Sequence, residues 1–284
     1  MVEIYDFDQL YRSRVLKNIP SALSIGVYDG IHIGHQRIIA QTVTLAKNEV
    51  DGKVVVITFA QNPKTMMGRN PFKQPLMSLR QSTDFFSELG VDYLVVIDFS
   101  PDFSKLTGEE FIARCCAMFD VRAIVVGENF RCGSHADTGV EELRRIVPKY
   151  AQRAQVCVPE MYRLPDGTPD SSSLVRISLS EGKVSEVMAQ LGRHYSVDLA
   201  HIPSKKSEYP LRFSLSSFVQ LLPPPGVYET VLVMANGSQW RMIANLNEEF
   251  LTLTSKAASK PGSLSTSLDR TERYDNLQFV KELT

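Results

Sequence analysis

The sequence predicts an α/β fold with a parallel sheet over residues 1–197 and a smaller β domain over residues 198–284. Three observations support this prediction: short runs that are almost wholly apolar, longer amphipathic runs between them, and a change of character after about Asp198. Hydrophobic residues make up 43% of the 284 residues and charged residues 22%, a composition typical of a globular protein. A chain of this length can bury an adequate core without disulfide bonds.

The apolar runs of the first part are rich in β-branched residues, as strands buried on both faces should be. They are Ala22–Val27, Lys53–Phe59, Tyr93–Ile97, Ala123–Gly127 and Gln155–Val158. Between them the predicted helices are His35–Glu49, Leu79–Leu89, Gly108–Phe119 and Gly139–Tyr150. Capping boxes, Ser78 with Gln81 and Thr107 with Glu110, mark two of the helix starts. Strands that alternate with helices in this way predict a Rossmann-like parallel sheet.

The later part begins with two shorter helical patterns, Ser172–Glu181 and Val184–Leu191. Strand-like pieces follow at Val227–Met234 and Trp240–Ala244, and the Asn-Gly pair between them predicts a hairpin turn. The stretch Thr252–Ser267 is rich in Ser, Thr and Lys and is predicted to be a loop. These features predict a small β domain.

Charge and cysteine content exclude several classes of function. The net charge is −1, so no overall field favours nucleic acid or an anionic membrane, and any phosphate-binding groups must be gathered locally. The cysteines Cys115, Cys116, Cys132 and Cys157 show neither metal-binding spacing nor a disulfide framework. The N-terminus lacks the pattern of a signal peptide, and no run approaches the roughly 20 apolar residues of a membrane span. We therefore expect a cytoplasmic protein that binds small molecules.

The first predicted strand runs into the segment Gly26–His35, after which a helix begins at once. Glycines let the backbone approach a ligand, and the new helix presents free N–H groups to it. His32 and His35 can both donate to phosphate oxygens, and a protonated histidine gives a bond of roughly 1.5–3 kcal/mol. Gly34 would leave room for a purine or a triphosphate. The alternatives are two polar residues in a surface turn, or a metal site, for which no third ligand is nearby.

A second segment, Asp170–Arg176, opens a late helix with serines. Serine hydroxyls and free N–H groups at a helix start can bind an anion. Arg176 lies four residues after Ser172, on the same helix face. The alternative is an ordinary N-cap followed by a solvated arginine. Together with the histidine loop, the segment is predicted to form a second clamp on the same triphosphate.

These residues resemble the nucleotidyltransferase superfamily, and more closely the FAD synthetase module of bacterial bifunctional riboflavin kinase/FMN adenylyltransferases. The segment Gly26–Gln36 is similar to that family's Gly-x-Phe-Asp-Gly-x-His-x-Gly-His-Gln, with Tyr28 in place of Phe. Gly127–Gly133, Ser171–Arg176 and Leu191–Tyr195 also match in the expected order. The resemblance covers about residues 22–197.

The resemblance implies a reaction in which the FMN phosphate attacks the α-phosphorus of ATP, giving FAD and pyrophosphate with Mg²⁺ bridging the triphosphate. It implies that His32 and His35 contact the phosphates, and that Ser172 and Arg176 hold the β- and γ-phosphates. The other residues it assigns to ATP or FMN binding are Gly26, Tyr28, Asp29, Gly34, Asn62, Gly127, Asn129, Arg131 and Ser173. It assigns no residue to a metal site. One departure is Ala60, where many relatives carry an acidic residue.

The resemblance weakens in the C-terminal part. The family's kinase barrel has a Gly-Phe-Pro-Thr-Ala-Asn segment, to which the nearest match is Arg212–Ser217, without the Thr and Asn. No glutamate-bearing strand equivalent is found past Asn245. We therefore expect an adenylyltransferase with a barrel remnant and no riboflavin kinase activity. The alternatives are a bifunctional enzyme with a diverged kinase domain, a nucleotidyltransferase with another phosphorylated or alcohol substrate, and a decayed flavin- or ATP-binding regulator.

Overall fold

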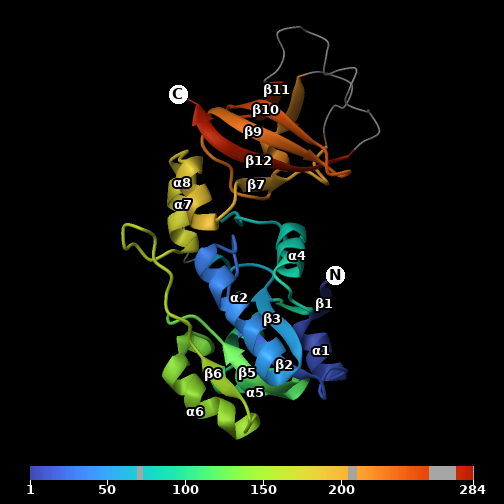
Figure 1. Ribbon diagram of the computed structural model, residues 1–284, viewed down its shortest axis with the longest axis vertical. Coiled ribbons are helices and arrows are strands. Elements are labelled where there is room, and N and C mark those ends of the chain that lie inside the picture. The colour runs from blue at the N-terminus through green and yellow to red at the C-terminus, as the bar shows by residue number, and fades with distance from the viewer. Residues whose placement is uncertain (69–72, 204–209, 256–272, 284) are drawn as a thin grey trace. The chain divides into compact units, whose positions relative to one another are not determined.

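The computed structural model describes residues 1–68, 73–203, 210–255 and 273–283. The chain forms two compact units (Figure 1): the first comprises Met1–Lys73 and Leu79–Asp170, and the second comprises Gln74–Ser78 and Ser171–Thr284. The units divide earlier than residue 197/198, because the two helices that follow Ser171 pack into the apolar core of the second unit.

The first unit contains a six-stranded parallel sheet, as the sequence predicts. Its strands are β1 (Glu3–Asp6), β2 (Pro20–Ile25), β3 (Lys53–Phe59), β4 (Tyr93–Ile97), β5 (Asp120–Val125) and β6 (Gln155–Cys157). The strand order is β1-β4-β3-β2-β5-β6. Strand β2 is therefore central, with β3 and β5 on either side, and the loops that follow these three strands leave the same edge of the sheet.

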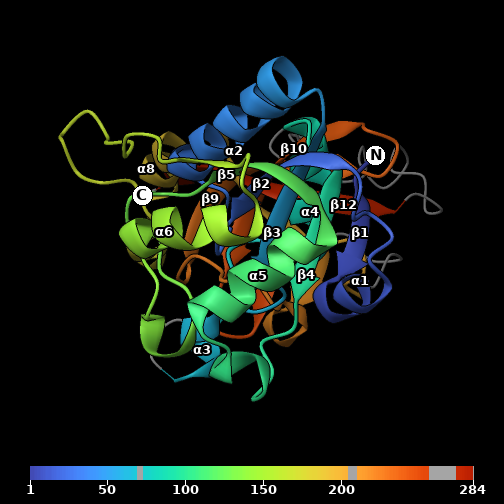
Figure 2. The ribbon, with the colours of Figure 1, turned by 90° about the horizontal axis from the view of Figure 1, so that it is seen from below.

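Helices cover both faces of this sheet (Figure 2). They are α1 (Phe7–Ser13), α2 (Ile33–Leu45), α3 (Pro63–Met66), α4 (Leu79–Glu88), α5 (Gly108–Met118) and α6 (Val140–Tyr150), with short helical turns η1 (Ala46–Val50), η2 (Phe103–Lys105) and η3 (Ser134–Ala136). On the α5 and α6 face, Phe111 and Leu143 pack with Leu23, Ile25 and strand residues beside them in one apolar cluster. Helix α2 lies on the other face and contacts β2 and β5.

The predicted capping box of α5 is present: Thr107 accepts from the backbone N–H of Glu110, and the Glu110 carboxylate accepts from the N–H of Thr107 at 2.8 Å. Helix α4 begins at Leu79 as predicted, and the Ser78 hydroxyl donates to the Asp198 carboxylate at 2.7 Å. The capping box that the sequence predicts at Thr107 therefore marks the start of α5.

Two elements at the N-terminus were not predicted from the sequence. Strand β1 pairs with β4 at one edge of the sheet, and most of its residues are exposed, so it lacks the apolar run that marks a buried strand. Helix α1 follows, and the Asp6 carboxylate at its N-cap accepts from the N–H of Gln9. The predicted helix ending at Glu49 also differs, because α2 gives way to the π-helical turn η1 after Leu45.

The second unit contains a curled six-stranded antiparallel sheet (Figure 1). Its elements are α7 (Ser172–Ser180), α8 (Val184–Leu191), η4 (Leu215–Ser217), β7 (Tyr195–Asp198), β8 (Leu211–Ser214), β9 (Gly226–Met234), β10 (Gln239–Leu246), β11 (Phe250–Ser255) and β12 (Tyr274–Leu283). The strand order is β7-β12-β9-β10-β11-β8, and neighbouring strands run antiparallel.

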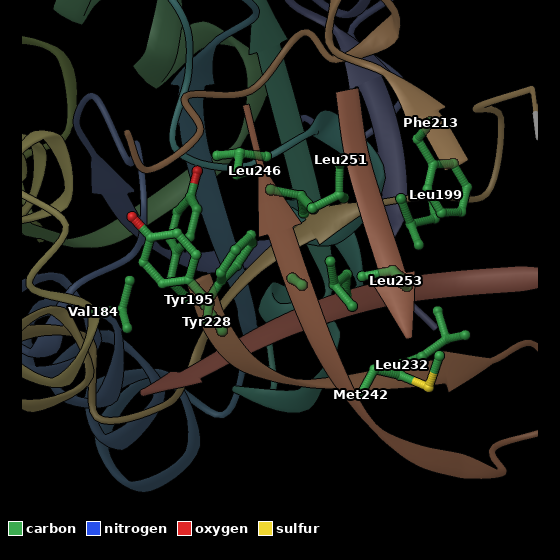
Figure 3. Close-up of a cluster of buried hydrophobic side chains, with 14 of the residues drawn as sticks. Val184, Tyr195, Leu199, Phe213, Tyr228, Leu232, Met242, Leu246, Leu251 and Leu253 are labelled. Carbon is green, nitrogen blue, oxygen red and sulfur yellow. The ribbon is translucent and has the colours of Figure 1, made fainter. Parts of the chain in front are cut away.

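The curled sheet surrounds an apolar core (Figure 3), and Leu232, Met242 and Leu251 belong to the same buried cluster as the α8 residue Val184. The predicted hairpin joins β9 and β10, and Gly237 adopts a φ of +84° at its turn. The predicted loop at Thr252–Ser267 is wrong in its first part, since Thr252–Ser255 completes β11; residues 256–267 lie outside the described residues. In the described parts of the chain, no helix is long and apolar enough to span a membrane.

Candidate active site

The candidate site of the first unit lies where β2 ends and α2 begins. Three neighbouring parallel strands, β3, β2 and β5, end at this edge, which is where ligands bind in open α/β sheets. The segment Gly26–His35 connects β2 to the first turn of α2. The predicted histidines are therefore placed at the position the sequence pattern indicates.

The backbone of this connection makes a sharp turn. Gly30 has a φ of +80° and Ile31 a φ of +37°, both in the left-handed region. For a β-branched residue such as Ile31 this conformation is strained, and strain of this kind persists only where the surroundings fix it. The Ile31 side chain is fully buried, and its carbonyl accepts from Gln36 Nε2 at 2.9 Å. The turn brings His32 to the N-cap of α2.

The two histidines lie one against the other. The centroids of the His32 and His35 rings are 3.7 Å apart and the ring planes are inclined by 32°. The Tyr28 ring contacts His35 edge-on at 5.0 Å, and the Tyr28 hydroxyl hydrogen-bonds the hydroxyl of Ser24 on β2. Tyr28, which stands where the family pattern has Phe, thus ties the imidazole pair to the central strand.

Asp170 is the polar partner of His32. Its Oδ2 lies 2.9 Å from His32 Nδ1 and accepts the backbone N–H of Gly34 at 3.1 Å. The Asp170 side chain is fully buried and that of His32 is 7% exposed. One carboxylate oxygen therefore holds both the imidazole ring and the first turn of α2.

The surroundings of His35 determine the protonation state of its ring. Burial, reinforced by the neighbouring His32, holds the pKa of His35 well below its ordinary value. Burial also raises the pKa of the Tyr28 hydroxyl, which stays protonated at neutral pH. His35 is thus a neutral imidazole at pH 7. The sequence pattern alone is compatible with a positive charge on both rings.

Gly34 lies directly against the His32 ring. A Cβ atom at Gly34 would lie 3.0 Å from His32 Cε1 and 3.1 Å from His32 Nδ1. The missing side chain therefore makes room for the His32 ring. A Cβ at Gly26 would lie 3.1 Å from the Tyr28 ring, and one at Gly127 would lie 3.3 Å from an Ile38 methyl group.

The remaining predicted residues of the first unit lie on the loops after the neighbouring strands. Asp29 is partly buried in the turn before α2, and the carbonyl of Asn62 accepts from the first turn of α3 after β3. Asn129 and Arg131 are exposed in the loop after β5. The Arg131 guanidinium lies against Gly139 at the start of α6.

The predicted serine-rich segment belongs to the second unit. Ser171 is the N-cap of α7 and accepts from the N–H of Leu174 at 3.2 Å, while Ser172 begins the helix and Ser173 is exposed. Arg176 is only 3% exposed, and its Nη1 donates to the carbonyl of Ser172 at 3.2 Å. The alternative of a solvated arginine is therefore wrong.

Sequence reasoning did not single out Asp170 as a site residue, although it directly precedes the serine-rich segment. It is 138 positions from His32, and no local pattern indicates that the two meet. An acidic residue next to a predicted anion-binding segment is the only signal that could have drawn attention to it. Over the part of the chain that the structure describes, no three His, Cys, Asp or Glu side chains gather as a metal site.

Known proteins are similar to this chain over much of its length. A family model described as FAD synthetase matches residues 16–164. The "Bifunctional riboflavin kinase/FMN adenylyltransferase" of Buchnera aphidicola subsp. Schizaphis graminum is 26% identical over 181 residues, which cover 63% of this chain and 57% of that relative. The match thus spans less than two thirds of this relative's length. A protein named "FAD synthetase" from Listeria monocytogenes is 26% identical over 179 residues, 62% of this chain and 70% of that one.

The fold is also similar to a solved structure. The crystal structure titled as a macrolide-efflux protein from Streptococcus pneumoniae superposes with a TM-score of 0.76 at 20% identity, and the match covers 100% of both chains. At this identity the similarity concerns the fold. The family model, in contrast, covers more than half of the chain, including the whole histidine loop. The chain belongs to the FAD synthetase family.

Proposed function

We propose that the chain transfers AMP from ATP to the phosphate of FMN, giving FAD and pyrophosphate. The observation that carries this proposal is the pair of imidazoles in contact, with ring centroids 3.7 Å apart, at the N-terminus of the helix that follows the central strand. Helix N-termini and histidine N–H groups are suited to bind phosphate oxygens. Membership of the FAD synthetase family and the name of the Listeria relative support the choice of FMN as acceptor.

In this proposal the chain acts by positioning and by charge stabilisation, since adenylyl transfer asks for little covalent chemistry from the protein. His32 and His35 contact the phosphates at which negative charge grows as pyrophosphate leaves. Ser172 and Arg176 supply the contacts to the β- and γ-phosphates that the family resemblance implies, with Ser173 beside them. The binding surfaces for adenosine and flavin would be formed by Gly26, Tyr28, Asp29, Gly34, Asn62, Gly127, Asn129 and Arg131.

We also propose that Mg²⁺ assists the reaction by neutralising charge on the triphosphate. Within the described ranges no cluster of three acidic, histidine or cysteine side chains is arranged for a metal ion. Magnesium commonly keeps several waters and binds through substrate phosphates with one or two carboxylates. The ion would then be held chiefly by the phosphates.

The second unit is proposed to lack riboflavin kinase activity. The segment that aligns with the kinase phosphate motif, Arg212–Ser217, spans the end of β8 and the turn η4. Within it Phe213 is fully buried in the core of the unit, and the Arg212 guanidinium lies 3.6 Å from the centroid of the Phe250 ring. Neither side chain replaces the missing Thr and Asn. FMN would then be supplied by another enzyme or by uptake. The cytoplasmic location of the protein stays a prediction.

The test is chromatography of the products formed by purified protein with ATP and Mg²⁺, given FMN or riboflavin in separate reactions. We expect FAD from FMN and neither FMN nor FAD from riboflavin. FMN from riboflavin would show that the second unit is an active kinase. The absence of product from both substrates would contradict the proposal and favour a binding protein.

A further inference from the structure

We propose that Asp170 is a positioning residue for His32: it holds the imidazole through Nδ1 and so leaves Nε2 as the nitrogen available to the triphosphate. This inference rests on the proposed function for its catalytic consequence, although the pairing itself can be tested without any substrate. Asp170 has no role in the phosphate clamp that the sequence predicts.

The hydrogen bond fixes which nitrogen carries a proton. A carboxylate is an acceptor, so an Asp170 Oδ2 atom 2.9 Å from His32 Nδ1 requires a proton on Nδ1. The Nε2 atom then points away from Asp170. It donates a hydrogen bond when the ring is doubly protonated and accepts one when the ring is neutral. A free histidine has no such preference, and its ring can rotate about its side-chain bonds.

The same carboxylate oxygen also fixes the ring relative to the helix. It accepts the N–H of Gly34 at 3.1 Å, within the first turn of α2, where a negative charge is favoured by the helix dipole. A Cβ atom at Gly34 would press on the His32 ring at 3.0 Å, so the glycine and the carboxylate hold this ring from two sides. The His32 ring therefore has little freedom to turn.

A hairpin-like segment places Asp170. Its backbone N–H donates to the carbonyl of Tyr162 at 3.2 Å, and Arg163 and Pro169 form an isolated bridge between them. The Arg37 guanidinium of α2 lies 4.3 Å from the centroid of the Tyr162 ring. This contact joins the base of the segment to α2, whose N-cap residue is His32. Asp170 and His32 are therefore held near each other although they are far apart in sequence.

The pairing with Asp170 also distinguishes His32 from His35. Two imidazoles at 3.7 Å repel when both are charged, and burial holds the pKa of His35 below its ordinary value. His32 Nδ1 has the Asp170 carboxylate as its partner, whereas His35 Nδ1 has no hydrogen-bond partner among the described residues. Of the two rings, His32 is therefore the one whose orientation is fixed by a carboxylate.

The first test is steady-state kinetics of FAD formation by Asp170→Asn and Asp170→Ala. Asparagine keeps an oxygen that can accept from Nδ1 but removes the charge, and alanine removes both. We expect kcat to fall about 10- to 100-fold for asparagine and further for alanine, with a smaller change in the KM for ATP. Asp166→Asn is the control, because Asp166 is an exposed carboxylate in the same hairpin, where its Oδ1 accepts from the N–H of Thr168. Unchanged kcat in both Asp170 variants would contradict the proposal.

The second test needs no activity. Nitrogen NMR of histidine-labelled protein, with the His32 signals assigned from His32→Gln, reports which ring nitrogen carries hydrogen. We expect a wild-type His32 with hydrogen on Nδ1, and a mixture of tautomers in Asp170→Ala. A wild-type ring without hydrogen on Nδ1, or one unchanged in Asp170→Ala, would overturn the inference. If the wild-type protein forms no FAD, the proposed function fails, and the NMR result still decides the role of Asp170.

Discussion

At the scale of single residues, the candidate site is a row of three aromatic rings in contact, with one buried carboxylate at its end. Tyr28 contacts His35, His35 lies on His32, and His32 is bonded to Asp170. Each of these side chains restricts the position of the next, so the imidazole rings are held in place before a substrate binds. Such preorganisation lowers the cost of stabilising charge in the transition state.

Replacing His35 by alanine should lower kcat/KM for FAD formation about 10- to 100-fold, because a hydrogen bond to a charged phosphate is lost. The measurement is the initial rate with ATP and FMN, together with circular dichroism to confirm folding. His201→Ala is the control, since His201 is exposed in the second unit. A folded His35→Ala protein with the wild-type rate would exclude this histidine from the phosphate contacts.

The lowered pKa of His35 predicts how stability depends on pH. The unfolded chain protonates this residue near pH 6.5, whereas the folded protein does not, so the unfolded state binds more protons below that pH. The free energy of unfolding should therefore decrease as the pH falls from about 6.5 toward the lowered folded pKa. Two titratable side chains, His32 and Tyr28, contact His35 through their rings.

Denaturant titrations at pH 7.5 and pH 5.5 measure this effect. We expect His35→Gln to lose less stability between the two pH values than the wild-type protein, by up to about 1.4 kcal/mol per pH unit. An identical loss in both proteins would show that His35 is protonated in the folded state.

The sequence could predict the two histidines but not their partner. The spacing of His32 and His35 at a strand-to-helix connection is a local signal, and the structure places both rings where that signal indicates. Asp170 contacts His32 across a large separation in sequence, and no periodicity or motif indicates that the two side chains meet. The neutral state of His35 also depends on burial, which only the folded structure supplies.

At the scale of elements, the start of α2 depends on a glycine that makes room for its own N-cap residue. Gly34→Ala places a methyl group 3.0 Å from the His32 ring and so must displace the ring or the helix turn. We expect kcat for FAD formation to fall about 10-fold or more, since small displacements at a reacting centre are costly. Ala40→Ser, an exposed change on the same helix, serves as the control. A normal kcat in Gly34→Ala would show that the ring position is not critical.

The capping box at α5 allows a prediction about stability. Thr107→Ala removes the acceptor for the N–H of Glu110, and it should lower the free energy of unfolding of the first unit by about 1 kcal/mol. Urea unfolding followed by circular dichroism measures the change. Thr44→Ala, on the exposed side of α2, should alter stability by less than about 0.5 kcal/mol. Equal effects of the two substitutions would argue against the capping contribution.

Elements with strong local signals are predicted well from the sequence. The continuous apolar runs Lys53–Phe59 and Tyr93–Ile97 are strands with those bounds, and α8 spans the predicted Val184–Leu191. Strand β1 was missed because it lies at an exposed edge, and the end of β11 was predicted as a loop because its threonines and serine are also common in loops. In both cases tertiary pairing decides the structure where composition does not.

At the scale of the whole molecule, the chain combines a parallel α/β unit with an antiparallel β unit, each with its own apolar core. The sequence predicts both classes of architecture. It does not predict that α7 and α8 contribute to the core of the β unit, because an apolar helix face does not specify which sheet it will cover. The family match covers the parallel unit, and the proposed chemistry is centred there.

Isotopically labelled ATP can show whether the protein transfers an adenylyl group to FMN. With FMN as acceptor, ATP labelled in the α-phosphate and ATP labelled in the γ-phosphate are used in parallel reactions, and the flavin product is separated and counted. We expect label in FAD from α-labelled ATP and none in any flavin from γ-labelled ATP. A flavin labelled from the γ-phosphate, or no label from the α-phosphate, would contradict adenylyl transfer.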